Sequence, residues 1–217
     1  MRRILNFLSE LEQNNNRDWF EQNRVVYEEA RSLFEGFIAE VLSSLSRIDS
    51  RLRALTPKQV IFRIYRDTRF AHDKTPYKNN FGAHLSRGGR NTGEPGYYFH
   101  LQPGEGFLSA GIYRPDSNWL EAIRKEIYLF PEDYLGIVEQ PEFKKRFTIF
   151  SEERLSRPPV GFPADFQLIE VLKNKHFCPT LVYPENWLDE PNLVDRVIEQ
   201  YALMKPFNDF LYRSVET

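Results

Sequence analysis

The stretch from Gln59 to Leu85 reads QVIFRIYRDTRFAHDKTPYKNNFGAHL, and it decides which kind of fold this chain adopts. Its first residues alternate in character with a period of two, which is typical of a strand. Residues 67–80 lose that period and contain Pro76, which indicates a loop, and residues 81–85 resume the alternation. The stretch therefore predicts two strands joined by a long loop.

Further strands and helices are predicted on both sides of this stretch. Residues 97–102 and 107–113 flank a Pro-Gly-Glu-Gly segment, which is a hairpin signal, and residues 177–182 are a candidate fifth strand. Apolar residues at helical spacing over 4–11, 19–45 and 193–207 predict helices. We therefore expect an α+β fold that forms one domain over residues 1–217. Its mostly antiparallel sheet of four to five strands would pack against long N- and C-terminal helices.

The composition is that of an ordinary globular protein, with 217 residues, 41% hydrophobic and 28% charged. A single cysteine, Cys178, excludes an internal disulfide. The apolar run at the N-terminus is interrupted too early for a signal peptide, and no run approaches the length of a membrane span. We expect a cytoplasmic protein with no membrane partner.

Positive charge is concentrated around the predicted loop. The segment Lys58–Arg90 contains eight Lys and Arg but only two Asp, a net charge of +6, whereas the whole chain has a net charge of −2. A local positive field on an acidic protein favours an anion, and arginine and lysine are the residues that bind phosphate or carboxylate. We predict a pocket for a small anionic ligand, formed by Arg63, Arg66, Asp67, Arg69, Lys74, Tyr77, Lys78 and His100.

His100 belongs to this prediction because it shares one strand face with Tyr98 and Gln102, opposite three apolar residues. That polar face either lines the pocket or is the solvent-facing side of the sheet. Within the pocket, Asp67 or Asp73 would orient an arginine or act as a base.

Two other interpretations of the basic stretch are open. An unpaired buried guanidinium is strongly unfavourable, so the charges could form an ion-pair network that joins helix to sheet in a non-catalytic structural or partner-binding protein. Cations interleaved with Phe and Tyr also resemble a stacking platform for nucleic acid. A pI near 6.1 and the compactness of the basic segment make a nucleic-acid partner the less favoured choice.

Motifs of familiar catalytic centres are absent from the sequence. There is no HExxH, paired CxxC, GxSxG, Walker loop or GxGxxG, so we predict no metal site and no cofactor. His176 and Cys178 are two residues apart and could form a Cys–His nucleophile, although a lone cysteine is more often a core residue. Whether the protein is an enzyme, and its oligomeric state, stay open.

Several segments form a pattern that extends over nearly the whole chain. They are Phe7–Leu8, Asn15–Phe20, Asn23–Tyr27, Phe62–Phe70, Asp73–Lys78, Gly96–Pro103, Gly111–Tyr113 and Pro206–Leu211. Together they resemble the DUF2461 family of uncharacterised proteins. The resemblance implies a single-domain bacterial-type cytosolic protein and brings no catalytic residue with it. It also implies that Asp18 and Trp19 support the site, so that Asp18 would face Arg63 or Arg66.

Overall fold

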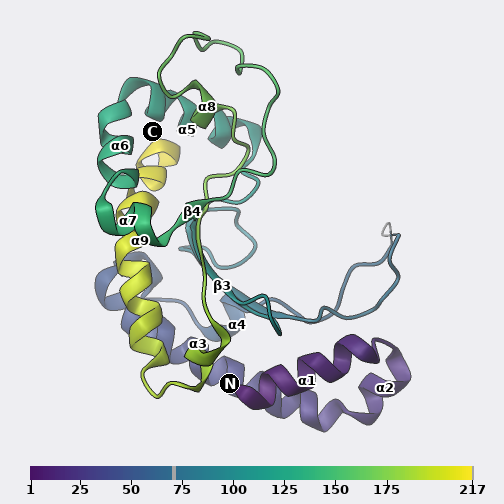
Figure 1. The fold of residues 1–217 in the computed structure, drawn as a ribbon. Coiled ribbons are helices and arrows are strands. Elements are labelled where there is room, and N and C mark those ends of the chain that lie inside the picture. Colours follow the sequence, from purple (N-terminus) through teal and green to yellow (C-terminus); the bar gives the residue numbers. More distant parts are fainter. Residues whose placement is uncertain (70–71, 217) are drawn as a thin grey trace. The chain divides into compact units, whose positions relative to one another are not determined.

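A computed structural model describes residues 1–69 and 72–216 (Figure 1), so Phe70 of the quoted motif lies outside the described residues. The α-helices are α1 (Arg2–Gln13), α2 (Arg17–Gln22), α3 (Arg24–Ile48), α4 (Pro57–Val60), α5 (Ser117–Leu129), α6 (Pro131–Val138), α7 (Pro141–Arg146), α8 (Ile169–Leu172) and α9 (Leu193–Glu216). The strands are β1 (Phe81–Leu85), β2 (Gly96–Leu101), β3 (Phe107–Gly111), β4 (Thr148–Ile149) and β5 (Pro179–Val182). Two short 3-10 helices are η1 (Ser50–Leu52) and η2 (Glu185–Asp189).

The strands of the described residues form one five-stranded antiparallel sheet in the order β1-β2-β3-β5-β4. At its β4 edge, Thr148 is opposite Thr180 and Ile149 is opposite Pro179. The predicted α+β class and the predicted antiparallel sheet are therefore confirmed. The two-residue strand β4 was not predicted, because so short a segment carries no periodicity.

The strand predicted over residues 60–65 is wrong. Val60 ends α4, which begins at Pro57 and has a capping box formed by Thr56 and Gln59. Beyond α4 two isolated bridges, Ile61–Ala83 and Tyr65–Tyr77, join the chain to its returning segment. The two bridges are four residues apart in the first segment, from 61 to 65, and six apart in the returning segment, from 77 to 83. The two additional residues in the returning segment interrupt the ladder as a bulge does. We call residues 61–66 and 76–83 the arm, and residues 67–75 the basic loop.

The single helix predicted over residues 19–45 is two helices that meet at Asn23. The side chain of Asn16 caps α2 by accepting a hydrogen bond from the Trp19 N–H. Asn23 then ends α2 and begins α3, with φ −105° and ψ 17°. The long N- and C-terminal helices of the prediction are α3 and α9.

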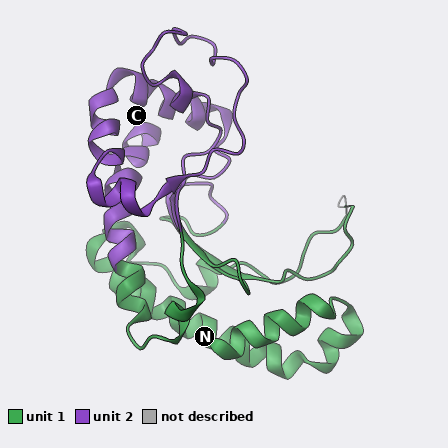
Figure 2. Cartoon of the chain, in the orientation of Figure 1, with its two compact units in different colours: residues 1–90, 98–108, 182–198 green, residues 91–97, 109–181, 199–217 purple. Residues whose placement is uncertain are grey.

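Contacts divide the described residues into two compact units (Figure 2). Unit 1 contains residues 1–90, 98–108 and 182–198, and unit 2 contains residues 91–97, 109–181 and 199–217, of which 217 is not described. Because the segments of the two units alternate along the chain, this division does not correspond to two consecutive sequence domains. The expectation of one domain over residues 1–217 stays a prediction.

The core of unit 1 lies between α3 and one face of the sheet. Phe34 of α3 is fully buried, and its ring centroid is 5.3 Å from that of Phe81 and 6.1 Å from that of Phe99. Phe99 alternates along β2 with Tyr98 and His100, which are only half-buried. The helix therefore covers the apolar side chains of β2, and the polar ones lie on the opposite face of the strand.

The core of unit 2 surrounds the C-terminal part of α9. Phe207 is fully buried and its ring contacts those of Tyr134 and Phe143. Pro206 lies inside α9, and the helix continues through it to Glu216. Buried aromatic residues on one side of α9 thus pack against α6 and α7.

Candidate functional site

The arm is held by main-chain hydrogen bonds between its two segments. The N–H of Phe62 donates to the carbonyl of Gly82 at 2.9 Å, and the N–H of Lys78 donates to the carbonyl of Ile64 at 2.8 Å. A third bond joins the N–H of Arg66 to the carbonyl of Pro76 at 2.9 Å. The arm therefore places the basic loop beyond the edge of the sheet, with Phe62 and Lys78 near its base.

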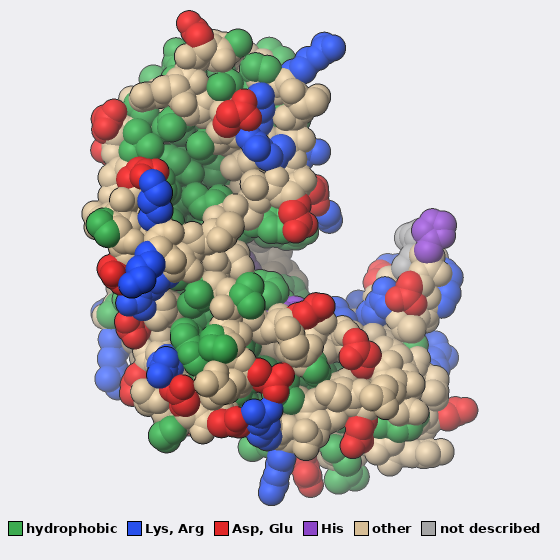
Figure 3. Space-filling view, viewed as in Figure 1, with side chains coloured by type: hydrophobic (Ala, Val, Ile, Leu, Met, Phe, Trp, Pro, Cys, Tyr) green, Lys and Arg blue, Asp and Glu red, His purple; other side chains and the backbone are tan. Residues whose placement is uncertain are grey.

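Ion pairs with aspartates of the basic loop neutralise two of the five predicted cations, Arg66 and Arg69. Arg69 donates to both carboxylate oxygens of Asp67, at 3.0 and 2.7 Å, and Arg66 donates to Asp73 at 2.5 Å and also to Thr75. The ammonium of Lys74 donates to the main-chain carbonyl of Thr68 at 2.9 Å. Figure 3 shows acidic and basic side chains close together on the projecting loop. This part of the motif matches the ion-pair interpretation, and the pairs form within the loop rather than between helix and sheet.

These ion pairs change the acidity of both aspartates. Hydrogen bonds from the Arg69 side chain and main-chain N–H lower the pKa of Asp67 to about 2. The Arg66 guanidinium, together with Thr75, lowers the pKa of Asp73 to about 2. Both carboxylates are therefore charged at neutral pH, and neither is poised to act as a base.

We expect Arg66→Gln to raise the pKa of Asp73 towards its ordinary value of 3.8, because the substitution removes the Arg66 guanidinium, whose hydrogen bond is the largest cause of the lowered pKa. In the native protein, the stabilisation from this pair is complete above the ordinary pKa and is lost as the pH falls through about 2. An NMR titration of the side-chain carboxyl carbons measures both pKa values. Asp67 is the internal control, because its partner Arg69 is unchanged, and an unshifted Asp73 would exclude the ion pair.

Tyr77 anchors the arm and is buried rather than open to a ligand. Its ring stacks on that of Phe20 with centroids 3.9 Å apart and planes at 11°. The Asn15 side chain accepts from the Tyr77 N–H at 3.1 Å and donates to the Tyr77 carbonyl at 3.0 Å, as a neighbouring strand would. Burial is the main cause of a raised pKa of the Tyr77 phenol. Its predicted place in the pocket is therefore replaced by a role in packing.

The two supporting residues do not contact the arginines. Asp18 is exposed in the first turn of α2 and makes no ion pair or hydrogen bond with any described residue, so the expected contact with Arg63 or Arg66 is absent. The Trp19 ring stacks against Phe7 with centroids 6.2 Å apart. Both residues lie at the start of α2, and their supporting role at a site stays a prediction.

Arg63 and Lys78 are two cations close enough to affect one another. Lys78 is half-buried, and its ammonium lies 5.3 Å from the centroid of the Phe62 ring. Burial first, and the Arg63 charge second, lower the pKa of Lys78. Within residues 1–69 and 72–216, neither side chain has an ion pair with a carboxylate, although Arg63 contributes weakly to the lowered pKa of Asp67. Arg63 and Lys78, like Lys74 on its neutral carbonyl partner, therefore keep their positive charge uncompensated by a carboxylate.

A chain of hydrogen bonds connects the polar side chains of β2. Gln102 donates to the carboxylate of Glu105 at 2.8 Å, so its amide oxygen faces His100 Nε2 at 3.0 Å. That oxygen can only accept, which places the imidazole proton on Nε2 and leaves Nδ1 to accept from the Tyr98 hydroxyl at 3.0 Å. Burial lowers the pKa of His100 and raises the pKa of Tyr98 to about 12. Both groups are therefore neutral at neutral pH.

Neighbouring rings and a glycine fix this chain of hydrogen bonds in place. The His100 ring stacks on Phe107 with centroids 4.5 Å apart, and Tyr98 contacts Phe62 with centroids 6.3 Å apart. A Cβ atom at Gly82 would lie 2.5 Å from the Tyr98 hydroxyl, so only glycine leaves room for it. Because Phe62 contacts both Lys78 and Tyr98, these side chains form one continuous strip on unit 1.

The strip combines two kinds of chemistry. Arg63 and Lys78 supply positive charge, whereas the Tyr98 proton is committed to His100, so the phenol oxygen can accept a hydrogen bond from a ligand hydroxyl or N–H. A proton taken up there could pass to His100 Nδ1, with Gln102 holding the opposite nitrogen. The arrangement suits an anion that also carries a hydrogen-bond donor.

The alternative nucleophile in unit 2 is not activated. Burial raises the pKa of the Cys178 thiol to about 12, and His176 Nδ1 accepts a hydrogen bond from the main-chain N–H of Arg114 at 3.0 Å. Among the described residues, no group of three or more His, Cys, Asp or Glu side chains is arranged to hold a metal ion. In the same part of the chain, every helix is too short or too polar to cross a membrane.

Of the predicted site residues, Lys78 and His100 lie on this strip, Arg63 is close enough to Lys78 to lower its pKa, and the others lie in the loop or in packed positions. Sequence reasoning missed Phe62, Phe107 and Glu105. Phe62 lies two residues before Ile64 on an alternating segment, so the sequence places both side chains on one face. Alternation alone does not show whether an aromatic ring on that face packs in the core or lines a binding site.

Comparisons with known proteins give one result. The family model described as Conserved hypothetical protein (DUF2461) matches residues 3–210. Comparisons with curated proteins and with solved structures give no match.

Proposed function

The chain belongs to the DUF2461 family, which brings no activity with it, and we propose from the geometry that unit 1 binds a small anion carrying phosphate or carboxylate. The proposed binding groups are Arg63 and Lys78, with Tyr98 and His100 beside them. This is narrower than the eight-residue pocket expected from the sequence, because Arg66, Arg69 and Lys74 already have partners in the loop.

The observation that supports the proposal most strongly is the pair of unneutralised cations. The Arg63 charge helps to lower the pKa of Lys78, so the two cations repel one another, and an anion between them would remove that repulsion. Lys78 is also half-buried, so its interaction with an anion is less screened than that of an exposed lysine. Arginine and lysine together offer a forked and a point-like donor for one anionic group.

The aromatic and neutral groups of the strip support a small ligand rather than a nucleic acid. A phosphate backbone is bound by several uncompensated cations along a surface. Here Arg66 and Arg69 are neutralised by Asp73 and Asp67, and the Lys74 ammonium is held by the carbonyl of Thr68. The Tyr98 oxygen would accept from a hydroxyl of the ligand, which favours a hydroxy acid or a phosphorylated sugar over inorganic phosphate.

We expect Lys78→Met to weaken anion binding by about tenfold to a hundredfold, the effect of losing one charge-assisted hydrogen bond. Methionine keeps the apolar stem that lies over Phe62, so the arm should stay folded. Isothermal titration calorimetry with citrate and with glucose 6-phosphate, at low and moderate salt, measures the affinity. Thermal unfolding verifies that the variant is folded.

Arg69→Gln is the matched control, because it removes a cation of the same motif that is already paired with Asp67 and is exposed. It should leave the affinity unchanged within about twofold, since a screened and neutralised surface charge contributes little. Equal loss of affinity in both variants would indicate general electrostatic attraction and would contradict a site at Lys78. Absence of binding by the native protein to every probe would favour the ion-pair network and a structural role.

A further inference from the structure

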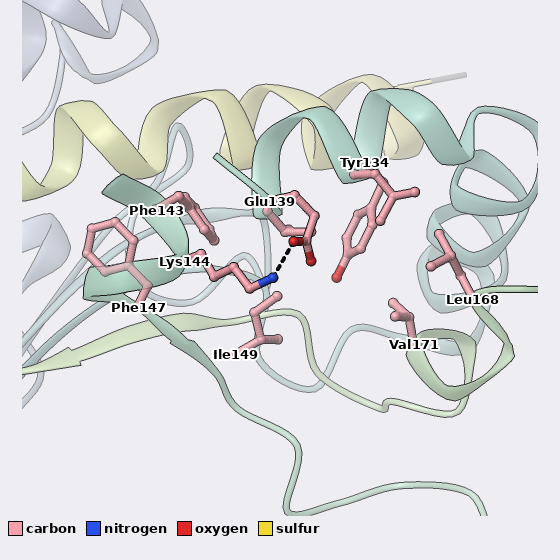
Figure 4. Close-up of a pocket in the computed structure, with 10 residues that line it drawn as sticks. Tyr134, Glu139, Phe143, Lys144, Phe147, Ile149, Leu168 and Val171 are labelled. Carbon is pink, nitrogen blue, oxygen red and sulfur yellow. Dashed lines mark hydrogen bonds and ion pairs between the residues drawn. The ribbon is translucent and has the colours of Figure 1, made fainter. Parts of the chain in front are cut away.

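A hollow in unit 2 lies apart from the strip just described and shares no residue with it. Its volume is about 250 Å³, and it is lined by α6, α7, β4 and the segment 168–171 (Figure 4). Apolar side chains make up most of the lining, including Val138, Ile149, Leu168 and Val171, and these four are only half-buried. Apolar surface of this kind gains free energy when a ligand removes it from water.

The inner wall of the hollow is rigidly packed. The Tyr134 ring is 6.1 Å from Phe207 and 5.9 Å from Phe210, both on α9. The Phe143 ring is 5.1 Å from Phe147 and 6.0 Å from Phe207. Because the wall is fixed by the core of unit 2, the hollow is formed before any ligand arrives.

One polar group in this wall has no partner. Tyr134 is 2% exposed, and its hydroxyl makes no hydrogen bond with any residue in the described ranges 1–69 and 72–216. In Figure 4 the Tyr134 hydroxyl points into the hollow. Burial raises the pKa of this phenol, so it stays protonated and can donate or accept one hydrogen bond. Because the hydroxyl faces the hollow and is not committed to a protein group, it can bond to one polar atom of a ligand there.

The charges beside the hollow compensate one another. Lys144 and Glu139 both line it and form an ion pair, drawn as a dashed line in Figure 4. Both side chains are more than half exposed. A neutralised pair at the surface gives no net attraction for an ionic ligand. The hollow therefore favours an uncharged molecule.

We propose that this hollow binds a small, uncharged and mostly apolar ring compound with a single hydrogen-bonding atom that meets Tyr134. An apolar cavity of about 150 Å³ binds benzene. A hollow of about 250 Å³ is therefore large enough for a two-ring compound. The site does not depend on the proposed anion site in unit 1.

The test compares quinoline, whose ring nitrogen accepts a hydrogen bond, with naphthalene, which has the same shape and no acceptor. Ligand-observed NMR and calorimetry measure binding to the full chain. We expect the native protein to bind quinoline more tightly than naphthalene. Tyr134→Phe should weaken quinoline about twofold to tenfold and leave naphthalene unchanged, because it removes one neutral hydrogen bond and no ring surface.

Two variants test the location. Leu168→Trp and Val171→Phe each put a larger side chain into the hollow from a half-buried position, and both should abolish binding of either compound. Tyr128→Phe is the control, since it removes a tyrosine hydroxyl of unit 2 outside the lining. The proposal is overturned if the native protein binds neither compound saturably up to millimolar concentration, if both filled variants bind as the native protein does, or if Tyr134→Phe leaves the preference for quinoline intact.

Discussion

Gly111→Ala is expected to destabilise unit 2 by more than about 4 kcal/mol, the largest effect of any substitution proposed for this chain. Gly111 ends β3 with φ +97°, in a region of backbone conformation that side chains disfavour. A Cβ atom there would lie 1.9 Å from the carbonyl oxygen of Phe177 and 3.3 Å from the Cα of Cys178. These are main-chain atoms, so no side-chain rotation relieves the overlap.

The overlap falls on a pairing that holds unit 2 together. Ile112 and Phe177 exchange two main-chain hydrogen bonds, at 3.0 and 3.1 Å, immediately beside Gly111. Moving Phe177 away would break both bonds and leave buried polar groups without partners. Urea unfolding should show a lower midpoint, and the melting temperature should fall by about 10 °C or more.

Gly136→Ala is the control for this substitution. Gly136 lies within α6, and a Cβ atom there meets no atom within 4 Å. Alanine is favoured over glycine in a helix, so this variant should be about 0.4–1 kcal/mol more stable than the native protein. A Gly111→Ala protein as stable as the Gly136→Ala protein would show that Phe177 does not approach Gly111 as closely as the structure has it.

Asn208→Ala is expected to cost about 2–4 kcal/mol, the second largest effect. Asn208 is fully buried on α9. Its side chain accepts from the Gly111 N–H at 2.8 Å and donates to the Gly96 carbonyl at 2.9 Å. Alanine removes both bonds and leaves a small cavity, so the Gly111 N–H loses its acceptor in a place that water does not reach. Chemical unfolding measures the change.

Asn208→Asp separates hydrogen bonding from packing. The carboxylate still accepts from Gly111, but its second oxygen faces the Gly96 carbonyl and needs a proton. Burial beside a carbonyl raises the pKa of that aspartate, so the variant should be least stable at neutral pH and should regain stability as the pH falls through the raised pKa. Asn118→Ala is the control, since Asn118 is exposed in unit 2. Equal stability of the Ala variants at positions 208 and 118 would contradict the buried bridge.

Local sequence patterns were sufficient to predict most of the helices and strands. The apolar stripe of α3 and the alternation of β2 each reflect a repeat within a single element. The helix break at Asn23 and the two-residue strand β4 were missed, because neither changes the hydrophobic period of its neighbours. The interrupted pairing of the arm was missed because Ile61 and Tyr65 alternate as strand residues do, although a bulge keeps them from forming a continuous ladder.

The candidate site was predictable in part for a similar reason. A local excess of Lys and Arg identified the segment that carries charge, but the choice between a pocket and an ion-pair network depends on side-chain partners. The structure divides the motif: Arg66 and Arg69 pair with loop aspartates, whereas Arg63 and Lys78 do not. A count of charges treats all four alike.

The amino-acid sequence by itself determined the family, the α+β class, the positions of the long helices and the location of the positive charge, because each of these depends on composition or on a short-range repeat. Only the tertiary structure decided that Asn208 joins Gly96 to Gly111, that Tyr134 faces a hollow without a partner, and which cations are left unneutralised. The first two of these features depend on contacts between residues far apart in the chain. Such contacts are set by packing of whole elements, and no local pattern encodes them.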